Sequence, residues 1–273
     1  MIRPMSATTC NSVFQFTKMQ GTGNDFVLLD HAKVALGDLN LPEIAQKLCD
    51  RHYGVGADGL LTVEPGVAAA WQMRMFNPDG SESEMCGNGL RCHARYIRDH
   101  FAPDIPALDI ETGAGVLRAE FVESQVRVDM GPYRLGGSNV PLPHNLLGTE
   151  VSMGNPHVVI DVPDLATIPA SQFGPEIEHL PRYPARTNVH FIQRLSPTHT
   201  RQMTWERGAG LTLACGTGAC AVAVAAHLQF GSDRRQTVEV PGGQLTVEVL
   251  ENGHVLLMGP ATYVFDGEWP AAS

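Results

Sequence analysis

The sequence predicts an α+β fold made of two similar halves, and three observations support this prediction. Short runs of alternating or β-branched apolar residues recur along the 273-residue chain, separated by Gly, Pro and Asp. Helical segments are few, and two of them begin at the first glycine of a Cys-Gly-x-Gly sequence. The spacing of these rare signatures in the first half then returns in the second half. Mixed strands with central helices are typical of the α+β class.

The strand-like segments occur in both halves of the chain. They cover residues 14–18, 26–30, 72–77, 117–122 and 125–130, and then residues 158–162, 187–193, 201–206, 237–240, 244–249 and 254–258. Gly253, between the last two segments, predicts a tight hairpin because glycine tolerates a positive φ.

Three helices are predicted. The first covers residues 42–51 after Asn40, a favourable N-cap residue. The second covers Gly87–Phe101, and the third covers Gly216–Phe230 and stops at Gly231, a typical C′ glycine. The third helix is almost entirely small and apolar, so we expect it to be buried on most sides.

An internal repeat is visible in the spacing of the cysteine motifs. Asn24 and Cys86 are 62 residues apart, and Asn155 and Cys215 are 60 residues apart. Asn77 lies nine residues before the first cysteine, and Glu206 lies nine residues before the second. These parallel spacings favour two similar halves, with a boundary near residues 130–137.

The composition excludes several classes of protein. The chain has 19 Lys and Arg against 29 Asp and Glu, a formal charge of −10, which argues against a general nucleic-acid binder. With 43% hydrophobic and 18% charged residues, the chain is not a disordered one. The sequence contains no run of signal-peptide or membrane-spanning type. We therefore expect a cytoplasmic protein, without a membrane partner, whose six cysteines are reduced.

Each cysteine motif predicts a reactive thiol beside an anion-binding loop. A helix N-terminus carries unpaired N–H groups and partial positive charge, which should lower the pKa of Cys86 and of Cys215 from ~8.5. The glycines that follow allow a ligand to approach the backbone closely. If the halves face each other, the two thiols flank one bound carboxylate.

Two thiols on opposite faces suit the inversion of an α-carbon. One acts as a thiolate base and removes the proton, while the other acts as a thiol acid and returns one to the opposite face. Helix-terminal N–H groups would stabilise the charge that develops on the carboxylate. The chain contains neither a Walker A sequence nor a G-x-G-x-x-G sequence, so no cofactor is predicted.

The cysteines also have other interpretations. Cysteine is among the most buried residues, so a single Cys before a helix is more often a packing residue. Zinc bound by Cys86, Cys92, Cys215 and Cys220 is disfavoured, because their spacings lack paired knuckles and no histidine completes them. A disulfide between Cys86 and Cys215 is expected only on oxidation.

A series of longer motifs occurs in a fixed order along most of the chain. They are Gly21-Thr-Gly-Asn-Asp-Phe26, Arg51-His-Tyr-Gly-Val-Gly-Ala-Asp58, Phe76-Asn-Pro-Asp-Gly-Ser-Glu82, Met85-Cys-Gly-Asn-Gly-Leu-Arg91, Gly154-Asn-Pro-His157, Arg186-Thr-Asn188, Trp205-Glu-Arg-Gly-Ala-Gly210 and Ala214-Cys-Gly-Thr-Gly-Ala-Cys220. In these motifs the sequence resembles the diaminopimelate epimerase family, cofactor-independent enzymes that interconvert the LL and meso forms of 2,6-diaminopimelate.

The resemblance implies a fold, an activity and a set of site residues. The fold would be two pseudosymmetric α+β domains, each a β-barrel-like sheet around a central helix, with residues 1–131 and the returning segment 262–273 in one and 132–261 in the other. The activity would be epimerisation of diaminopimelate in the synthesis of lysine and peptidoglycan precursors. The reaction would need neither pyridoxal phosphate nor metal. A homodimer is the expected assembly. Cys86 and Cys215 would be the base and acid, assisted by His157 and Glu206. The substrate would be bound by Asn24, Asn77, Gly87, Asn88, Asn155, Asn188, Glu206, Arg207, Gly216 and Thr217.

Several of these residues also have simpler interpretations. Asn77 lies in an Asn-Pro-Asp-Gly sequence, where asparagine is commonly a turn former. His157 could be an ordinary strand residue, and Glu206-Arg207 could be a charged pair on the surface of a strand. Arg207 also suits the distal carboxylate of the substrate by forked hydrogen bonding, and Glu206 suits its ammonium group.

The sequence also allows three alternative functions. A proline or hydroxyproline racemase would share the reaction but resembles Cys-Gly-His-Gly at the first cysteine, where this chain has Asn88. Phenazine-type isomerases share the fold without the cysteine pair. A zinc-stabilised binding module is the third alternative.

Overall fold

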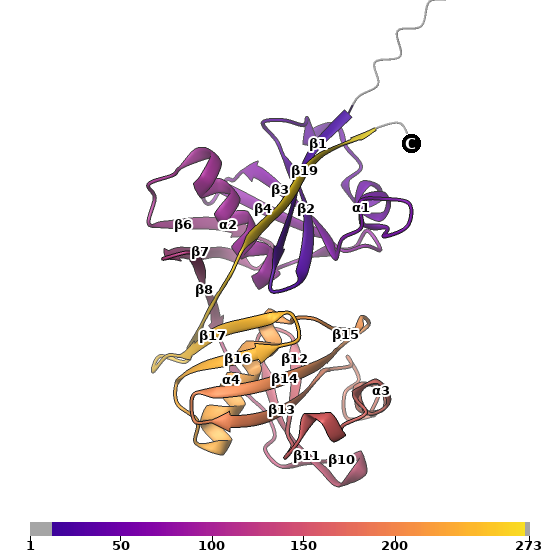
Figure 1. The fold of residues 1–273 in the computed structure, drawn as a ribbon, viewed down its shortest axis with the longest axis vertical. Coiled ribbons are helices and arrows are strands. Elements are labelled where there is room, and N and C mark those ends of the chain that lie inside the picture. Colours follow the sequence, from indigo (N-terminus) through magenta and orange to yellow (C-terminus); the bar gives the residue numbers. More distant parts are fainter. Residues whose placement is uncertain (1–12, 271–273) are drawn as a thin grey trace, which may run out of the picture.

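The computed structural model describes residues 13–270, which form two lobes (Figure 1). The first lobe contains β1 (Val13–Gly21), β2 (Asn24–Asp30), β3 (Gly59–Pro65), β4 (Trp71–Phe76), β5 (Glu82–Ser83), β6 (Ala107–Thr112), β7 (Gly115–Val122) and β8 (Gln125–Pro132), with η1 (Leu36–Asp38), α1 (Leu41–Cys49) and α2 (Gly87–Phe101).

The remaining elements form the second lobe and the return to the first. The strands are β9 (Arg134–Leu135), β10 (Val140–Leu142), β11 (Leu146–Ser152), β12 (Pro156–Asp161), β13 (Asn188–Ser196), β14 (His199–Glu206), β15 (Gly210–Thr212), β16 (Arg235–Val240), β17 (Gly243–Val249), β18 (His254–Gly259) and β19 (Thr262–Pro270). The helices are η2 (Pro143–Asn145), η3 (Leu165–Thr167), α3 (Ala170–Glu178) and α4 (Gly216–Phe230). Within residues 13–270, no helix is long and apolar enough to cross a membrane.

The two lobes share one strand-pairing pattern. When the strands are counted from β1 in the first lobe and from β11 in the second, the second and third strands are parallel in each lobe (β2 with β3, β12 with β13). The fourth strand is likewise parallel to the next long one (β4 with β6, β14 with β16). The other pairings along the two series are antiparallel in both lobes. α2 and α4 occupy the same place in the two series, as do α1 and α3. The predicted repeat and the α+β class are thus confirmed.

Two strand pairs join the lobes. β8, the last strand of the first series, pairs antiparallel with β18, its counterpart in the second, so the two lobes are linked at equivalent strands. β19 then crosses back and pairs antiparallel with β1 along Val13–Gln20 opposite residues 262–270, as the yellow strand in Figure 1 shows. The chain therefore passes between the lobes in closely spaced strands.

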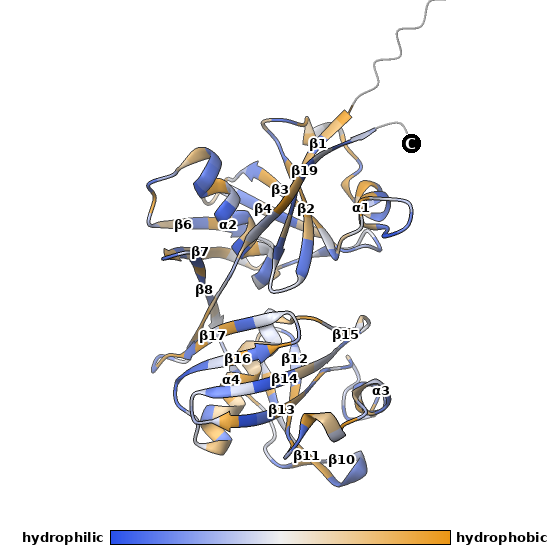
Figure 2. Cartoon of the chain, in the orientation of Figure 1, coloured by the Kyte–Doolittle hydropathy of each residue, from blue (hydrophilic) through white to orange (hydrophobic). Residues whose placement is uncertain are grey.

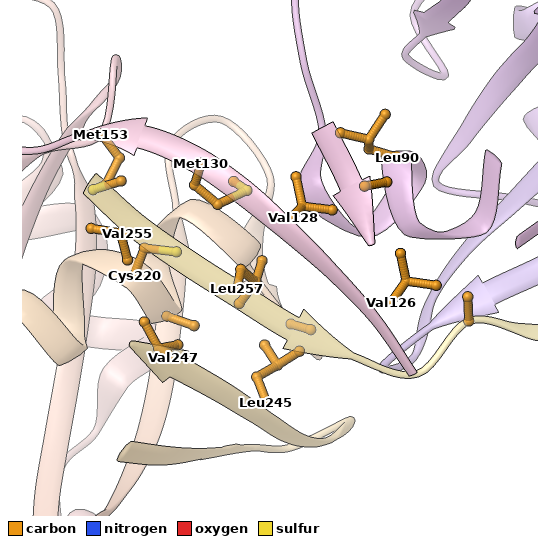
Figure 3. Packing of buried hydrophobic residues seen from close by; sticks show 14 of the residues in the cluster. Leu90, Val126, Val128, Met130, Met153, Cys220, Leu245, Val247, Val255 and Leu257 are labelled. Carbon is orange, nitrogen blue, oxygen red and sulfur yellow. The ribbon is translucent and has the colours of Figure 1, made fainter. Parts of the chain in front are cut away.

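One hydrophobic core extends through this junction. It contains Val126 and Val128 of β8 and Val255 and Leu257 of β18, which Figure 3 shows on these two neighbouring strands. The same cluster includes residues 219–225 of α4, whose ribbon lies toward the hydrophobic end of the scale in Figure 2. α4 is buried along most of its length, as its composition predicts, because β-strands surround it.

The structure also contains elements that the sequence pattern did not reveal. β3 is buried on both faces over residues 59–63, so it lacks the alternation that marks a half-buried strand. α3 has Pro175 inside it and no side-chain cap, so it lacks the usual start signal. β6 and β11 were also missed. Asn40 stands at the N-cap of α1 but its side chain makes no cap hydrogen bond; its Nδ2 donates to Glu43 Oε2 (3.2 Å).

The boundaries of the two central helices and of the last hairpin match their predictions. α2 and α4 have the predicted limits, and Gly231 adopts the left-handed conformation at the end of α4. Gly253 has a φ of 85° in the turn between β17 and β18. The clear start and stop residues explain this agreement.

Candidate active site

Cys86 and Cys215 are the N-cap residues of the two central helices. Both have extended backbone conformations, and neither side chain makes a cap hydrogen bond. The first hydrogen bonds within these helices join Leu90 N to Cys86 O (2.8 Å) and Ala219 N to Cys215 O (2.9 Å). The preceding N–H groups, those of residues 87–89 and 216–218, therefore have no acceptor within their helix and are suited to bind an anion.

The two helix starts are in contact across the lobes. A Cβ added at Gly216 would lie 3.5 Å from Asn88 Oδ1 and 3.2 Å from Leu257 Cδ2, and one added at Gly87 would also lie 3.2 Å from Leu257 Cδ2. Leu257 of β18 thus packs against both glycines. Asn88 is buried, and its Oδ1 has no hydrogen-bond partner within the protein. A donor from a bound molecule would satisfy this oxygen.

Burial raises the pKa of Cys86 above its ordinary value. The backbone N–H groups of Gly89 and Asn88 oppose this rise, the negative charge of Glu206 adds to it, and the Arg91 guanidinium opposes it. The helix start therefore does stabilise the thiolate, but to a smaller extent than burial destabilises it.

The pKa of Cys215 is raised further, well above its ordinary value. Burial is the largest cause and the charge of Glu206 the next, while the hydroxyl of Thr217 and the N–H of Gly218 oppose the rise. The prediction that both thiols have lowered pKa values is therefore wrong for this structure. The reason is that desolvation is the largest influence on the pKa of both thiols, which the position at a helix start did not reveal.

Asn24 faces the first thiol with its carbonyl oxygen. Its Nδ2 donates to Asp58 Oδ2 (2.7 Å), while its Oδ1 accepts from Asn88 Nδ2 (3.1 Å) and from the Cys86 thiol (3.8 Å). Because the Asp58 carboxylate can only accept, it fixes which end of the amide points toward Cys86.

A network of charges holds Asp58 in place. Arg51 donates to Asp58 Oδ1 (2.7 Å) and to Asp25 Oδ1 (2.8 Å), and Lys18 pairs with Asp25 (2.7 Å) and donates to Gly56 O. Although burial acts in the opposite direction, the hydrogen bonds from Arg51 and Lys18 hold the pKa of Asp25 below its ordinary value. These ionised groups tie the β1–β2 hairpin to the loop before β3.

Asn155 occupies the equivalent position beside the second thiol. Its Nδ2 donates to Thr217 Oγ1 (3.4 Å), and the Thr217 hydroxyl lies 3.7 Å from Cys215 Sγ. His157 contacts Asn155 Oδ1 through Nε2 (2.8 Å) and His190 Nε2 through Nδ1 (2.8 Å). Both ring nitrogens of His157 are thus bound to these two neighbours.

Glu206 is the last residue of β14 and Arg207 is the first residue of the turn to β15; together they are called the Glu206–Arg207 turn. Glu206 Oε1 accepts from Thr212 Oγ1 (2.6 Å), and burial raises the pKa of this carboxyl. The backbone N–H of Arg207 donates to Asn188 Oδ1 (3.0 Å), and its exposed guanidinium donates to Ala185 O (2.9 Å). Asn188 in turn donates to the carbonyl of residue 156 (3.0 Å), so it holds this turn against β12.

α3 is hydrogen-bonded to the same turn through its last residue. Glu178, at its end, is buried and accepts from Trp205 Nε1 (2.8 Å) and from Gly208 N (3.2 Å). Gly174 leaves room for the Trp205 ring, which a Cβ at this position would overlap. The residues that shape the Glu206–Arg207 turn therefore include Glu178, which the sequence reasoning missed because it missed the helix.

Asn77 lies in a turn after β4. Its Nδ2 donates to Ser81 Oγ (3.0 Å), and its backbone N–H donates to Ser81 O (2.8 Å). In this structure Asn77 is bound within its own turn, while the other sequence-predicted residues lie at or beside the two helix starts and the Glu206–Arg207 turn.

The remaining described cysteines are packing residues. Cys49, Cys92 and Cys220 are buried, and burial raises the pKa of Cys49 and of Cys92 to about 12. Within residues 13–270, no group of three or more His, Cys, Asp or Glu side chains is arranged to hold a metal ion. Cys10 lies outside the described residues.

Solved structures with a similar fold include racemases, epimerases and isomerases. A phenazine biosynthesis protein of the PhzF family from Bacillus anthracis superposes with a TM-score of 0.75 at 18% identity, over 94% of this chain and 99% of that one. A hydroxyproline epimerase from Agrobacterium vitis gives a TM-score of 0.71 at 14% identity, over 96% and 93%. The predicted fold is confirmed by these neighbours, which at such identities define the fold alone.

Sequence comparison identifies the family within this fold. The profile of the diaminopimelate epimerase family matches residues 16–136 and 149–264. Diaminopimelate epimerases from Pelotomaculum thermopropionicum and Microcystis aeruginosa are each 47% identical to the chain, over 93% of it and 98% of their own length. The enzyme from Synechococcus elongatus is 44% identical over 95% and 99%. The chain belongs to the diaminopimelate epimerase family, which confirms the resemblance seen in the sequence.

Proposed function

We propose that this protein epimerises LL-2,6-diaminopimelate to the meso form, with Cys86 and Cys215 as the acid–base pair. The observation that carries the proposal is that these two thiols stand at two helix starts which contact each other through Asn88 and Gly216. The reaction belongs to lysine and peptidoglycan precursor synthesis and uses no pyridoxal phosphate or metal.

The two thiols exchange protons with one carbon. A thiolate on one face of the α-carbon removes the α-proton and becomes a thiol, and the C–H electron pair remains on the substrate as a carbanion-like state. The opposite thiol then donates its proton to the other face and becomes a thiolate. The enzyme thus ends with the proton on the other cysteine, and the reverse reaction starts from that state.

The free N–H groups of the helix starts bind the carboxylate at the reacting end. Those of Gly87 and Asn88 in one lobe and of Gly216 and Thr217 in the other stabilise the charge as the α-proton leaves. Glu206 acts on both thiols through its charge, since its carboxylate raises the pKa of each. An ammonium group of the substrate near Glu206 would offset that charge and favour ionisation of a thiol.

The rest of the substrate is bound by the surrounding polar residues. We assign the distal amino acid to Glu206, for its ammonium, and to Arg207, for its carboxylate. The remaining binding residues in the proposal are Asn24, Asn77, Asn155 and Asn188, with His157 as an assisting residue. We treat residues 13–131 with 262–270 and residues 132–261 as two units that close around the substrate. A cytoplasmic location and a homodimer stay predictions, as does the absence of nucleic-acid partners.

Solvent isotope incorporation tests the mechanism. LL-diaminopimelate in deuterated water should take up deuterium at one α-carbon without added cofactor, and Cys86→Ala or Cys215→Ala should abolish epimerisation. Cys49→Ala, which changes a buried cysteine of the first lobe's α1 core, should retain activity. Turnover by the double alanine variant would overturn the mechanism. Activity on proline or hydroxyproline in place of diaminopimelate would overturn the substrate.

A further inference from the structure

The two lobes differ at one pair of equivalent core positions. Asn24 and Asn155 are equivalent, and two residues later the first lobe has Phe26 and the second has His157. Across the parallel ladder, Phe26 is level with residue 59 and His157 with residue 188. Two residues further along these partner strands stand Leu61 and His190. The first lobe thus has a buried Phe and Leu where the second has two buried histidines.

The two histidines form a hydrogen-bonded chain that ends at Asn155. His190 Nε2 lies 2.8 Å from His157 Nδ1, and His157 Nε2 lies 2.8 Å from Asn155 Oδ1. At the other end, His190 Nδ1 lies 3.0 Å from Thr204 Oγ1 and 3.2 Å from Gln202 Nε2. This hydrogen-bonded chain runs from Thr204 on β14 through His190 on β13 and His157 on β12 to Asn155 in the loop beside the second thiol.

The partners at both ends of this hydrogen-bonded chain require that each hydrogen bond is donated in the direction from His190 toward Asn155. Gln202 Nε2 can only donate, and it lies 3.2 Å from His190 Nδ1 as well as 2.6 Å from Thr204 Oγ1, so Nδ1 is the accepting nitrogen of His190. His190 must then donate through Nε2, and His157 accepts at Nδ1 and donates through Nε2. At the far end, Asn155 Nδ2 already donates to Thr217 Oγ1, so its Oδ1 is the atom that accepts from His157.

The rings stay neutral, which keeps this direction fixed. Burial lowers the pKa of His190 to about 3, and burial together with the neighbouring His190 and Arg207 lowers that of His157 well below its ordinary value. A neutral imidazole has one donor nitrogen and one acceptor nitrogen. Each ring therefore accepts a hydrogen bond on one side and donates one on the other.

We propose that His190 is a positioning residue for substrate binding: it holds His157 as an Nε2–H donor, so that Asn155 offers its amide N–H groups to the substrate. This inference rests on the proposed function, in which Asn155 binds substrate. The group that Asn155 contacts is then an acceptor, such as a carboxylate. Gly218 gives the His190 ring its space, because a Cβ there would overlap the ring and lie 3.0 Å from Cys215 Sγ.

The tautomers can be measured directly. Long-range proton–nitrogen correlation spectra of protein with isotope-labelled histidine should show His157 and His190 as neutral Nε2–H tautomers near neutral pH. Each signal is assigned by its loss in a variant of that residue. An Nδ1–H tautomer in either ring would overturn the inference. The spectra do not require turnover, so this result stands even if the wild-type protein proves inactive on diaminopimelate, which would refute the proposed function alone.

Two substitutions at His190 separate positioning from packing. His190→Leu places there the residue that the first lobe has at the equivalent position, so it should fold, and it should raise the KM for diaminopimelate about tenfold, as expected for one lost hydrogen bond. His190→Gln keeps a donor at Nε2 and should remain within about threefold of wild type. His93→Leu, at a buried histidine of α2 bonded to Gln72 O, should leave KM unchanged.

Two results with the His190 variants would contradict the inference. An unchanged KM in His190→Leu would show that the chain does not position Asn155. Equal impairment of His190→Leu and His190→Gln would show that the ring matters for packing and not as a donor. If His190→Leu does not fold, the Gln variant and the wild-type spectra still decide, because a tenfold KM rise in the Gln variant also contradicts the inference.

Discussion

Asn88, at the start of α2, packs against Gly216, at the start of α4, so that the two lobes meet at the ends of their central helices. A Cβ at residue 216 would lie 3.5 Å from Asn88 Oδ1 and 3.2 Å from Leu257 Cδ2. Because the proposed carboxylate site is formed by the amides of both helix starts, the distance between them determines how well a substrate fits.

The first prediction concerns this contact. Gly216→Ala should lower kcat/KM at least about tenfold, because the added methyl group lies 3.2 Å from Leu257 Cδ2, displaces this side chain where it packs against both helix starts, and misplaces the reacting carbon. Gly37→Ala is the control, since an added Cβ there meets no atom within 4 Å. Steady-state kinetics would check this, and wild-type kcat/KM in Gly216→Ala would contradict it.

The second prediction concerns oxidation. Two free thiols stand at adjoining helix starts, so a mild thiol oxidant such as diamide should inactivate the protein by joining Cys86 to Cys215, and dithiothreitol should restore activity. Peptide mass spectrometry would identify the bridge. The Cys215→Ala variant should form none. Irreversible loss of activity, or a bridge to another cysteine, would argue against thiols that face each other.

The elements with clear start and stop residues could be predicted from the sequence, and those without them could not. α2 and α4 begin at the first glycine of Cys-Gly-x-Gly, and Gly231 ends α4, so both were found with their limits. α3 lacks a cap and contains Pro175. The repeat was the signal that could have revealed α3, because α1 occupies the same place in the first lobe.

The positions of the two cysteines could be predicted from their motifs, but their surroundings could not. The Cys-Gly-x-Gly motifs placed Cys86 and Cys215 at two helix starts, as the structure has them, and their roles as acid and base stay a prediction. The direction of their pKa shifts could not, because burial is a property of the assembled lobes. His190 was missed for the same reason: it stands in an apolar strand, and its partner His157 is 33 residues away in the chain.

The third prediction concerns the support of the Glu206–Arg207 turn. Glu178→Gln should lower the free energy of unfolding by about 1–3 kcal/mol, because the buried carboxylate accepts from both Trp205 and Gly208 and an amide can accept from only one of them through oxygen. Urea unfolding would measure the change. The exposed Glu43, paired with Lys47 on α1, provides the control, where Glu43→Gln should change stability by less than about 0.5 kcal/mol. Equal effects of the two variants would contradict this role for Glu178.

The fourth prediction concerns the charge of Glu206. Because this carboxylate raises the pKa of both thiols, Glu206→Gln should lower the pKa of Cys215 and, to a smaller extent, that of Cys86. The rate of alkylation by iodoacetamide as a function of pH, measured in Cys86→Ala and Cys215→Ala backgrounds, reports each thiol separately. Glu239→Gln, at a carboxylate paired with Arg201, should leave both profiles unchanged. A higher thiol pKa in Glu206→Gln would refute the electrostatic role.

The last prediction concerns stability in acid. The pKa of His190 is about 3 in the folded protein and that of His157 is also depressed, whereas an unfolded histidine has a pKa of about 6.5. Below that value the unfolded chain binds protons that the folded protein excludes. The contribution of these rings to stability is therefore complete above about pH 6.5 and is lost progressively as the pH falls toward 3.

His190→Leu should make the loss of stability with falling pH shallower. Removal of one such ring takes away up to about 1.4 kcal/mol per pH unit between roughly pH 6 and pH 4. The groups that face His190 are His157, Thr204 and Gln202, with Cys215 across Gly218, and Arg207 acts on His157 by its charge. His93, whose pKa burial lowers to about 4, contributes in the same way, so His93→Leu should give a similar decrease in slope and the double variant a larger one. Urea unfolding at several pH values measures these slopes. An identical slope in the wild type and in His190→Leu would mean that His190 is protonated in the folded protein, and the neutral chain from His190 to Asn155 would then be wrong.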